Sequence, residues 1–548
     1  MGGEQFEQEE DAQGPMELLQ SLRSKATELL LREEWDESIH VYTKFIDLSR
    51  SEISNLSGSD PDPDPDSIPK LRKSLCLALC NRAEARARLR DFSEAMRDCD
   101  RALEIETTHF KTLLCKGKVL LGLSKYSSAL ECFKTALLDP QASDNLETVT
   151  GYIEKCKKLD FQAKTGAFDL SDWILSGFRG RSPELAEFIG SIEIKKSEVS
   201  GRGLFATKSI VAGALILVTK AVATERGILG SGESGEKAQL IMWKNFIEEV
   251  AESVRKCDRT RRLVLALSTG QDEDSLEIPE ISLFRPEEAF ESSKQSLDTE
   301  KLLSILDVNS LVEDAVSGKV MGKNRDYYGV GLWTLASFIN HSCIPNARRL
   351  HVGDYVIVHA SRDVKAGEEI TFAYFDVLSS PLEKRREMAE SWGFRCGCSR
   401  CKFESVLNVS NQEIREIEMG LERGVDAGNA VYMVEEGMKR WKVKGKDKGL
   451  LRASYWGVYD EVYNSERLMK RWGRKIPLME VVVDSVCDVI GSDERLMKMV
   501  VEGMMKKKKN NGGCSNVAEM ERIMKLGKGV YGKVVSKKKA MKTLLGLE

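Results

Sequence analysis

Apolar and polar positions follow one rhythm at the two ends of the chain and another in its centre. From Met16 to Gln141, apolar residues recur every three to four positions, which is the spacing of amphipathic helices. Apolar and charged residues then alternate in Ile192–Lys196, and an apolar run spans Ala214–Val218, so we expect two short strands joined by a glycine loop. Helical spacing returns beyond Glu404. The pattern predicts a multidomain α+β chain whose strands lie between two helical regions.

An internal repeat organises the first helical region. An aromatic residue is followed three positions later by a small residue in three places: Trp35/Ser38, Phe92/Ala95 and Tyr126/Ala129. The last two small residues are 34 positions apart, whereas the first two are 57 apart. The surplus falls on the Ser-, Asp- and Pro-rich segment Ser51–Pro69. We therefore expect three helix–turn–helix units, with an exposed, extended acidic insertion at 51–69.

This repeat resembles a tetratricopeptide array over residues 16–160, in which 141–160 form a closing helix. The resemblance implies a concave groove that holds a peptide partner. Basic or amide side chains stand at three positions of a carboxylate-binding groove and two further positions depart from it; these are Arg23, Asn81 and Lys111, and Thr27 and Cys115. We favour the simpler interpretation, solvated helix faces on a docking scaffold, and leave the peptide partner open.

Composition and charge exclude several classes of protein. The 548 residues are enough for several domains, and 42% hydrophobic with 31% charged residues fit a globular protein. A net charge of −4 gives no reason to expect direct nucleic-acid binding. Residues 1–15 carry five acidic and no basic side chains, which predicts a disordered acidic leader rather than a signal or transit peptide. No apolar run reaches membrane-spanning length, and we expect no membrane partner.

Four short motifs occur in order in the central region. They are Gly201-Arg202-Gly203-Leu204-Phe205-Ala206, Asn340-His341-Ser342-Cys343-Ile344-Pro345-Asn346, Gly367-Glu368-Glu369-Ile370-Thr371-Phe372-Ala373-Tyr374-Phe375-Asp376 and Cys396-Gly397-Cys398-Ser399-Arg400-Cys401. This ordered set resembles a SET-domain protein-lysine methyltransferase of the SMYD-like type, and it covers residues 191–402. SMYD proteins carry a zinc-binding MYND finger, but residues 220–330 contain a single cysteine, Cys257, so no finger forms there. An insertion at 225–300 takes its place.

Methyl transfer to lysine is an in-line displacement. It needs a neutral amine aligned with the donor in a site that excludes water, and it needs no protein nucleophile. The resemblance implies S-adenosylmethionine as the cofactor and Tyr374 as the catalytic residue, whose hydroxyl orients the amine. It places Phe372 in the substrate pocket, where Phe leaves more room than Tyr for several methyl groups. The cofactor-binding residues that the resemblance implies are Arg202, Gly203, Leu204, Asn309, Asn340, His341, Tyr374 and Phe394.

A cysteine cluster follows the last strand motif. Cys396, Cys398 and Cys401 are close enough in sequence for three thiolates to bind one metal ion, and a fourth sulfur completes a tetrahedral structural zinc site. The resemblance implies that Cys343 is the fourth ligand. Free thiols on a loop are the alternative, and most of the other cysteines lie in helical periodicity as small buried hydrophobes. The 13 cysteines, an odd number, favour a reducing compartment, so we expect the nucleus and/or the cytoplasm.

The C-terminal region is helical, and in SMYD-like proteins such a domain covers one side of the substrate cleft. Its basic runs, Lys506–Lys509 and Lys537–Lys539, suit a nuclear import signal, contact with nucleic acid or an acidic tail, or solvated helix ends, and we favour the last.

The expected organisation has six segments. They are a leader (1–15), tetratricopeptide-like repeats (16–160), a connector (161–190), a SET domain (191–380), a post-SET zinc segment (381–404) and a helical domain with a basic tail (405–548). The predicted function is methyl transfer from S-adenosylmethionine to a lysine of a histone or another protein, with chromatin regulation in the nucleus as one setting. The alternative is a tetratricopeptide interaction scaffold with an inactive SET domain.

Overall fold

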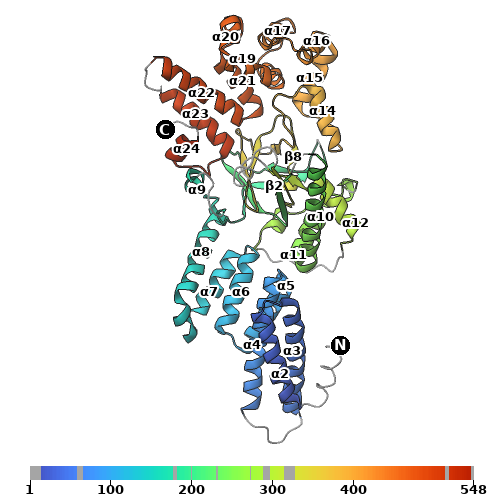
Figure 1. The fold of residues 1–548 in the computed structure, drawn as a ribbon, viewed down its shortest axis with the longest axis vertical. Helices are drawn as coiled ribbons and strands as arrows, with labels where there is room; N and C mark the ends of the chain where they lie inside the picture. The colour runs from blue at the N-terminus through green and yellow to red at the C-terminus, as the bar shows by residue number, and fades with distance from the viewer. Residues whose placement is uncertain are drawn as a thin grey trace. The chain divides into compact units, whose positions relative to one another are not determined.

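The computed structural model divides the chain into two compact units (Figure 1). It describes residues 14–58, 66–176, 182–198, 200–229, 232–271, 273–287, 297–313, 327–410, 412–511 and 517–544. One unit comprises Met1–Lys164, Glu249–Val264 and Arg285–Leu297, and the other comprises Thr165–Glu248, Leu265–Phe284 and Asp298–Glu548. The expected leader lies outside the described residues, except for its last two positions.

Paired helices build the first unit. They are α2 (Pro15–Leu31), α3 (Trp35–Gly58), α4 (Ser67–Arg88), α5 (Phe92–Ile105), α6 (Phe110–Gly122) and α7 (Tyr126–Ala136), followed by η1 (Pro140–Asn145) and α8 (Leu146–Thr165). The three aromatic residues of the sequence repeat begin α3, α5 and α7, and the three small residues of the repeat are 0% exposed. The helix–turn–helix repeat is therefore confirmed by the helix boundaries.

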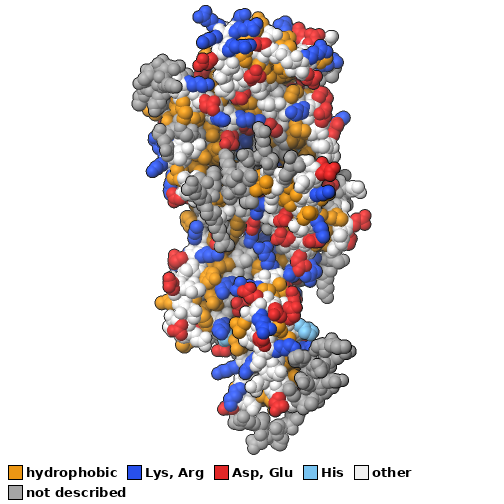
Figure 2. All heavy atoms as spheres, in the orientation of Figure 1, with side chains coloured by type: hydrophobic (Ala, Val, Ile, Leu, Met, Phe, Trp, Pro, Cys, Tyr) orange, Lys and Arg blue, Asp and Glu red, His pale blue; other side chains and the backbone are white. Residues whose placement is uncertain are grey.

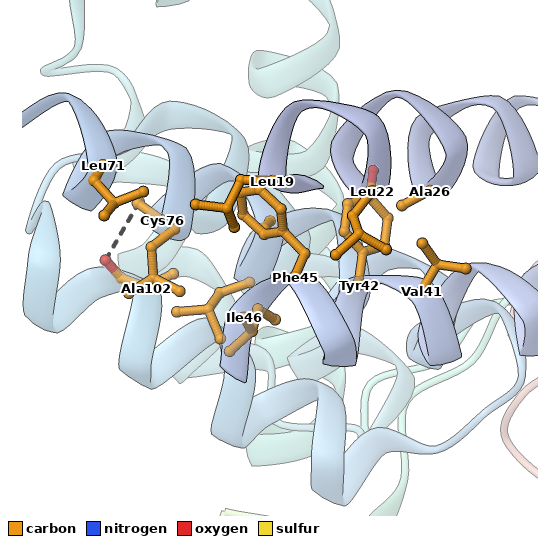
Figure 3. Close-up of a cluster of buried hydrophobic side chains, with 13 residues drawn as sticks. Leu19, Leu22, Ala26, Val41, Tyr42, Phe45, Ile46, Leu71, Cys76 and Ala102 are labelled. Carbon is orange, nitrogen blue, oxygen red and sulfur yellow. Dashed lines mark hydrogen bonds between the residues drawn. The ribbon is translucent and has the colours of Figure 1, made fainter. Parts of the chain in front are cut away.

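Close contact between paired helices explains why the repeated position carries a small residue. Ser38 Oγ donates to the carbonyl oxygen of Ala26 at 3.2 Å, a contact that joins the second helix of the first pair to the first. Larger apolar side chains, among them Leu22, Tyr42 and Phe45, form one buried cluster with Ala26 (Figure 3). A bulkier residue at the repeated position would collide with the facing helix.

The expected extended insertion at 51–69 is partly wrong. Helix α3 continues to Gly58 and α4 begins at Ser67, so both ends of the segment are helical. The remainder, residues 59–65, lies outside the described residues. The Ser-rich stretch that suggested a loop also carries Ile53 and Leu56, and Ile53 packs on the core of the array. That contact favours a longer helix over the local preference for a turn.

Three small sheets form the centre of the second unit. Their strand orders are β1-β4-β10-β9, β2-β3-β11-β8 and β5-β7-β6. The strands are β1 (Phe188–Ile189), β2 (Ile192–Lys196), β3 (Arg202–Ala206), β4 (Leu215–Lys220), β5 (Thr224–Ile228), β6 (Leu311–Val312), β7 (Tyr327–Gly331), β8 (Asn340–His341), β9 (Ala347–Val352), β10 (Tyr355–Ala360) and β11 (Glu369–Phe372).

The expected glycine loop between the first two predicted strands is wrong. Both strands exist, as β2 and β4, but they lie in different sheets. The glycine-containing stretch between them is itself strand β3, which pairs with β2 on one edge and with β11 on the other. Pairing along both edges outweighs the low strand preference of glycine.

Helices flank the strands along the chain. Within the insertion and after it lie α10 (Glu233–Lys256), α11 (Asp258–Leu265), the short turns η2 (Glu273–Ser275) and η3 (Ile281–Phe284), and α12 (Thr299–Asn309). After the strands come α14 (Leu382–Ser391), α15 (Ser399–Ser410), α16 (Gln412–Glu422), α17 (Ala427–Arg440), α18 (Asp447–Ser454), α19 (Trp456–Asn464), α20 (Glu466–Trp472), α21 (Met479–Ile490), α22 (Glu494–Asn511), α23 (Val517–Tyr531) and α24 (Lys538–Leu544). The predicted helical C-terminal region is confirmed.

The surface is mixed in charge. Basic and acidic side chains are interspersed on the face drawn in Figure 2, in keeping with the net charge of −4. In the basic run Lys537–Lys539, Lys537 Nζ lies 2.7 Å from an Asp172 carboxylate oxygen. Among the described residues, no helix has both the length and the apolar character needed to cross a bilayer.

Candidate active site

One sheet brings together three motifs that are far apart in sequence. Strand β3 pairs antiparallel with β11, with Leu204 opposite Ile370. Strand β11 also pairs parallel with the short strand β8, with Phe372 opposite His341. The glycine motif, the Asn-His motif and the tyrosine motif therefore share one piece of sheet.

The Asn340 side chain ties these strands together at their ends. Its Nδ2 donates to the carbonyl oxygen of Ser200 at 3.0 Å and to Oε1 of Glu369 at 2.8 Å. Gly203 permits this arrangement, since a Cβ there would lie 2.3 Å from the Glu369 oxygen and 3.2 Å from the Asn340 nitrogen. The second glycine of the motif thus has a steric role in this sheet.

His341 bonds in two directions. Its Nδ1 accepts from the backbone N–H of Tyr374 at 3.0 Å, and its Nε2 lies 3.3 Å from Cys343 Sγ. Because Nδ1 is an acceptor, the proton of the neutral ring is on Nε2, where it faces the sulfur. Both ring nitrogens are thus used inside the protein, so a hydrogen bond from His341 to a ligand would come from its backbone.

Tyr374 presents a protonated hydroxyl. Burial raises the pKa of Tyr374 to about 12, so the group stays neutral at physiological pH. The hydroxyl donates to the carbonyl oxygen of Ile339 at 2.9 Å, which fixes its position. A tyrosine held in this way can orient a polar group by hydrogen bonding, and it is poorly suited to act as a base.

Aromatic rings surround the tyrosine. The ring centroid of Phe372 lies 5.7 Å from that of Tyr374, and those of Trp392 and Phe394 lie 5.6 and 5.9 Å away. Phe394 also lies 5.3 Å from the His341 ring. Such a wall suits a flat ring or a cationic group.

A cleft of about 780 Å³ opens beside these rings. This volume is in the range of small-molecule sites. Most of the predicted cofactor residues line it, whereas Gly203, Leu204 and Phe372 lie outside its lining. The predicted site residues in the lining are Arg202, Asn309, Asn340, His341, Tyr374 and Phe394. Asn309 is held there by its Nδ2, which donates to the carbonyl oxygens of Ser268 and Ile305 at 2.8 and 2.7 Å.

Glu273 also lines the cleft. Its Oε1 accepts from the backbone N–H of Arg202 at 2.8 Å and from Nε of the same residue at 2.7 Å. The Arg202 side chain also donates to the carbonyl oxygens of Ala266 and Glu277. The backbone N–H of Arg202, one of the predicted cofactor-binding residues, is therefore bonded to this carboxylate.

The four predicted cysteine ligands converge. Their sulfur atoms all lie within 4.8 Å of one another. Cys343 Sγ is 3.8 Å from Cys396 Sγ and 3.6 Å from Cys401 Sγ. Four sulfurs at about 2.3 Å from a zinc ion would be about 3.8 Å apart at tetrahedral angles. The set therefore fits zinc.

Two buried guanidinium groups reinforce this fit. Arg385 and Arg400 have fully buried side chains and share one carboxylate, Glu404. Arg400 also donates to the carbonyl oxygen of Cys343 at 3.2 Å, and Arg385 Nη2 lies 4.0 Å from Cys401 Sγ. The two guanidinium groups and the one carboxylate leave an excess positive charge, and burying an unpaired charge costs free energy of folding. A zinc ion with four thiolates carries a net negative charge that offsets it.

Several of these residues gave no signal in the sequence. Glu273 lies in the insertion at 225–300, which matches no motif, and Arg385 and Glu404 lie in ordinary helical periodicity. Trp392 was open to detection, because it precedes Phe394 by two positions in an aromatic turn. The bonds of the other three depend on segments distant in sequence, which local patterns do not reveal.

Comparison with known proteins supports the motif-based resemblance. Residues 201–375 match the family model described as "SET domain". A protein named "Methyltransferase" from Gibberella zeae is 25% identical over 371 residues, which cover 62% of this chain and 48% of that protein. Human "Histone-lysine N-methyltransferase SMYD3" is 31% identical over 118 residues, covering 21% and 25% of the two chains. The matches thus span about half or less of the relatives' own length.

Solved structures resemble the helical array. The "TPR2B-domain:pHsp70-complex of yeast Sti1" is 21% identical with a TM-score of 0.20, covering 26% of this chain and 97% of that chain. The "Arabidopsis OM64 TPR domain" is 24% identical with a TM-score of 0.21, covering 26% and 98%.

Proposed function

We propose that this chain, whose residues 201–375 form a SET domain, transfers methyl groups from S-adenosylmethionine to a lysine side chain of a protein substrate. One observation carries the proposal: Asn340 and His341 from one motif, and Tyr374 more than thirty residues further along the chain, line the same cleft. Their convergence is what a single reaction centre requires.

The bound S-adenosylmethionine would supply an electrophilic methyl group on a sulfonium. The Tyr374 hydroxyl, kept protonated and fixed on Ile339, orients polar groups at the reaction centre. Phe394 and Trp392 supply an aromatic wall that suits the adenine ring and excludes water. Glu273 and the Asn309 side chain lie in the same cleft and provide polar contacts for the amino-acid and ribose groups.

Phe372 would shape the pocket for the lysine. It is 2% exposed and its ring centroid lies 5.7 Å from that of Tyr374, with the guanidinium carbon of Arg349 4.8 Å from its own ring centroid. This guanidinium favours a neutral amine over a charged ammonium nearby, and the neutral amine is the form that attacks the methyl group.

We further propose that Cys343, Cys396, Cys398 and Cys401 hold a structural zinc ion. The ion would fix the segment that carries Trp392 and Phe394, while the bond from His341 to Cys343 links it to the Tyr374 backbone. The expected six segments and the nuclear and/or cytoplasmic location remain proposals. So does a peptide partner on the helical array, where Arg23, Thr27 and Asn81 line a cavity of about 620 Å³.

A transfer assay tests the enzyme proposal. The purified full chain is incubated with donor labelled on the methyl group and a cell extract, beside Tyr374→Phe and the matched control Tyr432→Phe on α17. Loss of the hydroxyl should lower labelling by about 10²- to 10³-fold, the usual cost of one transition-state hydrogen-bond donor. Wild-type protein that binds the donor but labels nothing in a Tyr374-dependent way would instead favour the inactive scaffold.

A further inference from the structure

A second group of metal-ligating side chains lies in the helical array. Cys76 on α4, Glu106 at the C-terminal end of α5 and His109 just before α6 each offer one ligand atom, and these three atoms lie within 4.8 Å of one another. Cys76 is one of the cysteines in helical periodicity, for which the sequence predicts only a small buried hydrophobe. The turn between α5 and α6 brings the other two residues to it.

The protein holds all three residues in place. Cys76 is 1% exposed, and its thiol donates to the carbonyl oxygen of Ala102 at 3.4 Å (Figure 3). The backbone N–H of His109 donates to the carbonyl oxygen of Glu106 at 3.2 Å, so the turn itself fixes the spacing of these two ligands. Because these residues are already fixed, binding of a metal ion would cost little conformational entropy.

The histidine ring is also oriented by a neighbour. His109 Nδ1 lies 2.7 Å from the hydroxyl oxygen of Thr112, which is 0% exposed. A hydrogen bond to one ring nitrogen is the usual way in which proteins aim the other nitrogen at a metal ion. The exposed position of Glu106 leaves an entry path from solvent.

We propose that Cys76, Glu106 and His109 bind a zinc ion, with water as the fourth ligand. One thiolate, one imidazole and one carboxylate form a mixed sulfur, nitrogen and oxygen set, which suits tetrahedral zinc better than magnesium or calcium. On binding, the Cys76 thiol gives its proton to solvent and its sulfur exchanges the bond to Ala102 for a bond to the ion. The ion would tie α4 to the turn between the second and third helix pairs.

Zinc content of the full chain tests this site. The protein is dialysed against a weak chelator and its zinc is counted per chain by elemental mass spectrometry. Wild-type protein should hold two zinc ions, one here and one at the four cysteines. Cys76→Ser and His109→Gln should each hold one ion fewer. The control Cys132→Ser, a half-buried cysteine of the same array, should hold as many as wild type.

The difference between wild type and variants decides the outcome. Glu106→Gln guards against misfolding, because the residue is exposed and the change keeps its shape; it should weaken zinc binding at unchanged helicity by circular dichroism. Unchanged zinc content in Cys76→Ser, His109→Gln and Glu106→Gln would overturn the proposal, whatever the total. This result is independent of the methyl-transfer assay, so the two proposals fail separately.

Discussion

The contacts that stabilise the helical array differ in sequence range from those that stabilise the central sheet. In the array, neighbouring helices repeat one type of contact, a small residue against the preceding helix, and each contact is local in sequence. In the sheet, single side chains such as Asn340 and His341 join segments that are far apart. We infer that a change in the array has a local cost, whereas a change at the sheet affects several segments together.

The four-cysteine cluster should show the largest effect. Structural zinc contributes about 10–16 kcal/mol in small zinc-binding peptides, so Cys398→Ser should lose the ion and lower the melting temperature strongly. Zinc content and thermal unfolding of the purified chain measure this. Cys132→Ser in the array is the control. A Cys398→Ser protein with wild-type zinc content would show that the cluster does not hold the metal.

The buried charge network should rank next. Replacing Arg400 by Met leaves Glu404 with one guanidinium fewer and removes the bond to the Cys343 carbonyl, so we expect a loss of about 3–5 kcal/mol in the free energy of unfolding. Arg415→Met, at an exposed position of α16, should change this free energy by less than about 0.5 kcal/mol. Denaturant titration measures the free energy of unfolding of both variants. Equal losses in Arg400→Met and Arg415→Met would show that the buried charge network does not stabilise the fold.

The pH dependence of transfer should follow the substrate rather than Tyr374. The raised pKa of Tyr374, about 12, keeps its hydroxyl protonated below that pH. A free lysine amine with a pKa near about 10.4 gains about tenfold in its neutral form per pH unit. For a peptide substrate, kcat/KM should therefore rise by about 100-fold from pH 7 to pH 9. A decline within that range would mean that another group must stay protonated for transfer.

A substitution in the array should have the smallest effect. Ala129 is 0% exposed against the facing helix, so Ala129→Leu should cost about 1–3 kcal/mol through overpacking. Glu131→Leu, on the exposed side of the same helix, should stay within about 0.5 kcal/mol. Both variants should bind the donor as wild type does, as calorimetry can check. Weakened donor binding in Ala129→Leu alone would contradict the local character of array contacts.

The same contrast explains how much the sequence predicts. The positions of the second helices in the array follow from Trp35, Phe92 and Tyr126, because each unit of the repeat is recognisable within a short stretch of sequence. The four motifs also identify the cleft, since their residue types are unusual together. Strand β3 and the carboxylate of Glu273 were missed, because pairing along both strand edges and the bond to Arg202 depend on distant segments.

The most direct test of the account is the identity of the methylated residue. Protein labelled by the wild-type chain is hydrolysed, and its methylated amino acids are separated and identified by mass spectrometry. We predict methylated lysine, including forms with more than one methyl group because Phe372 takes up less room than a tyrosine would, and about 10²- to 10³-fold less of it with Tyr374→Phe. Tyr374-dependent label on any residue other than lysine would contradict the central claim.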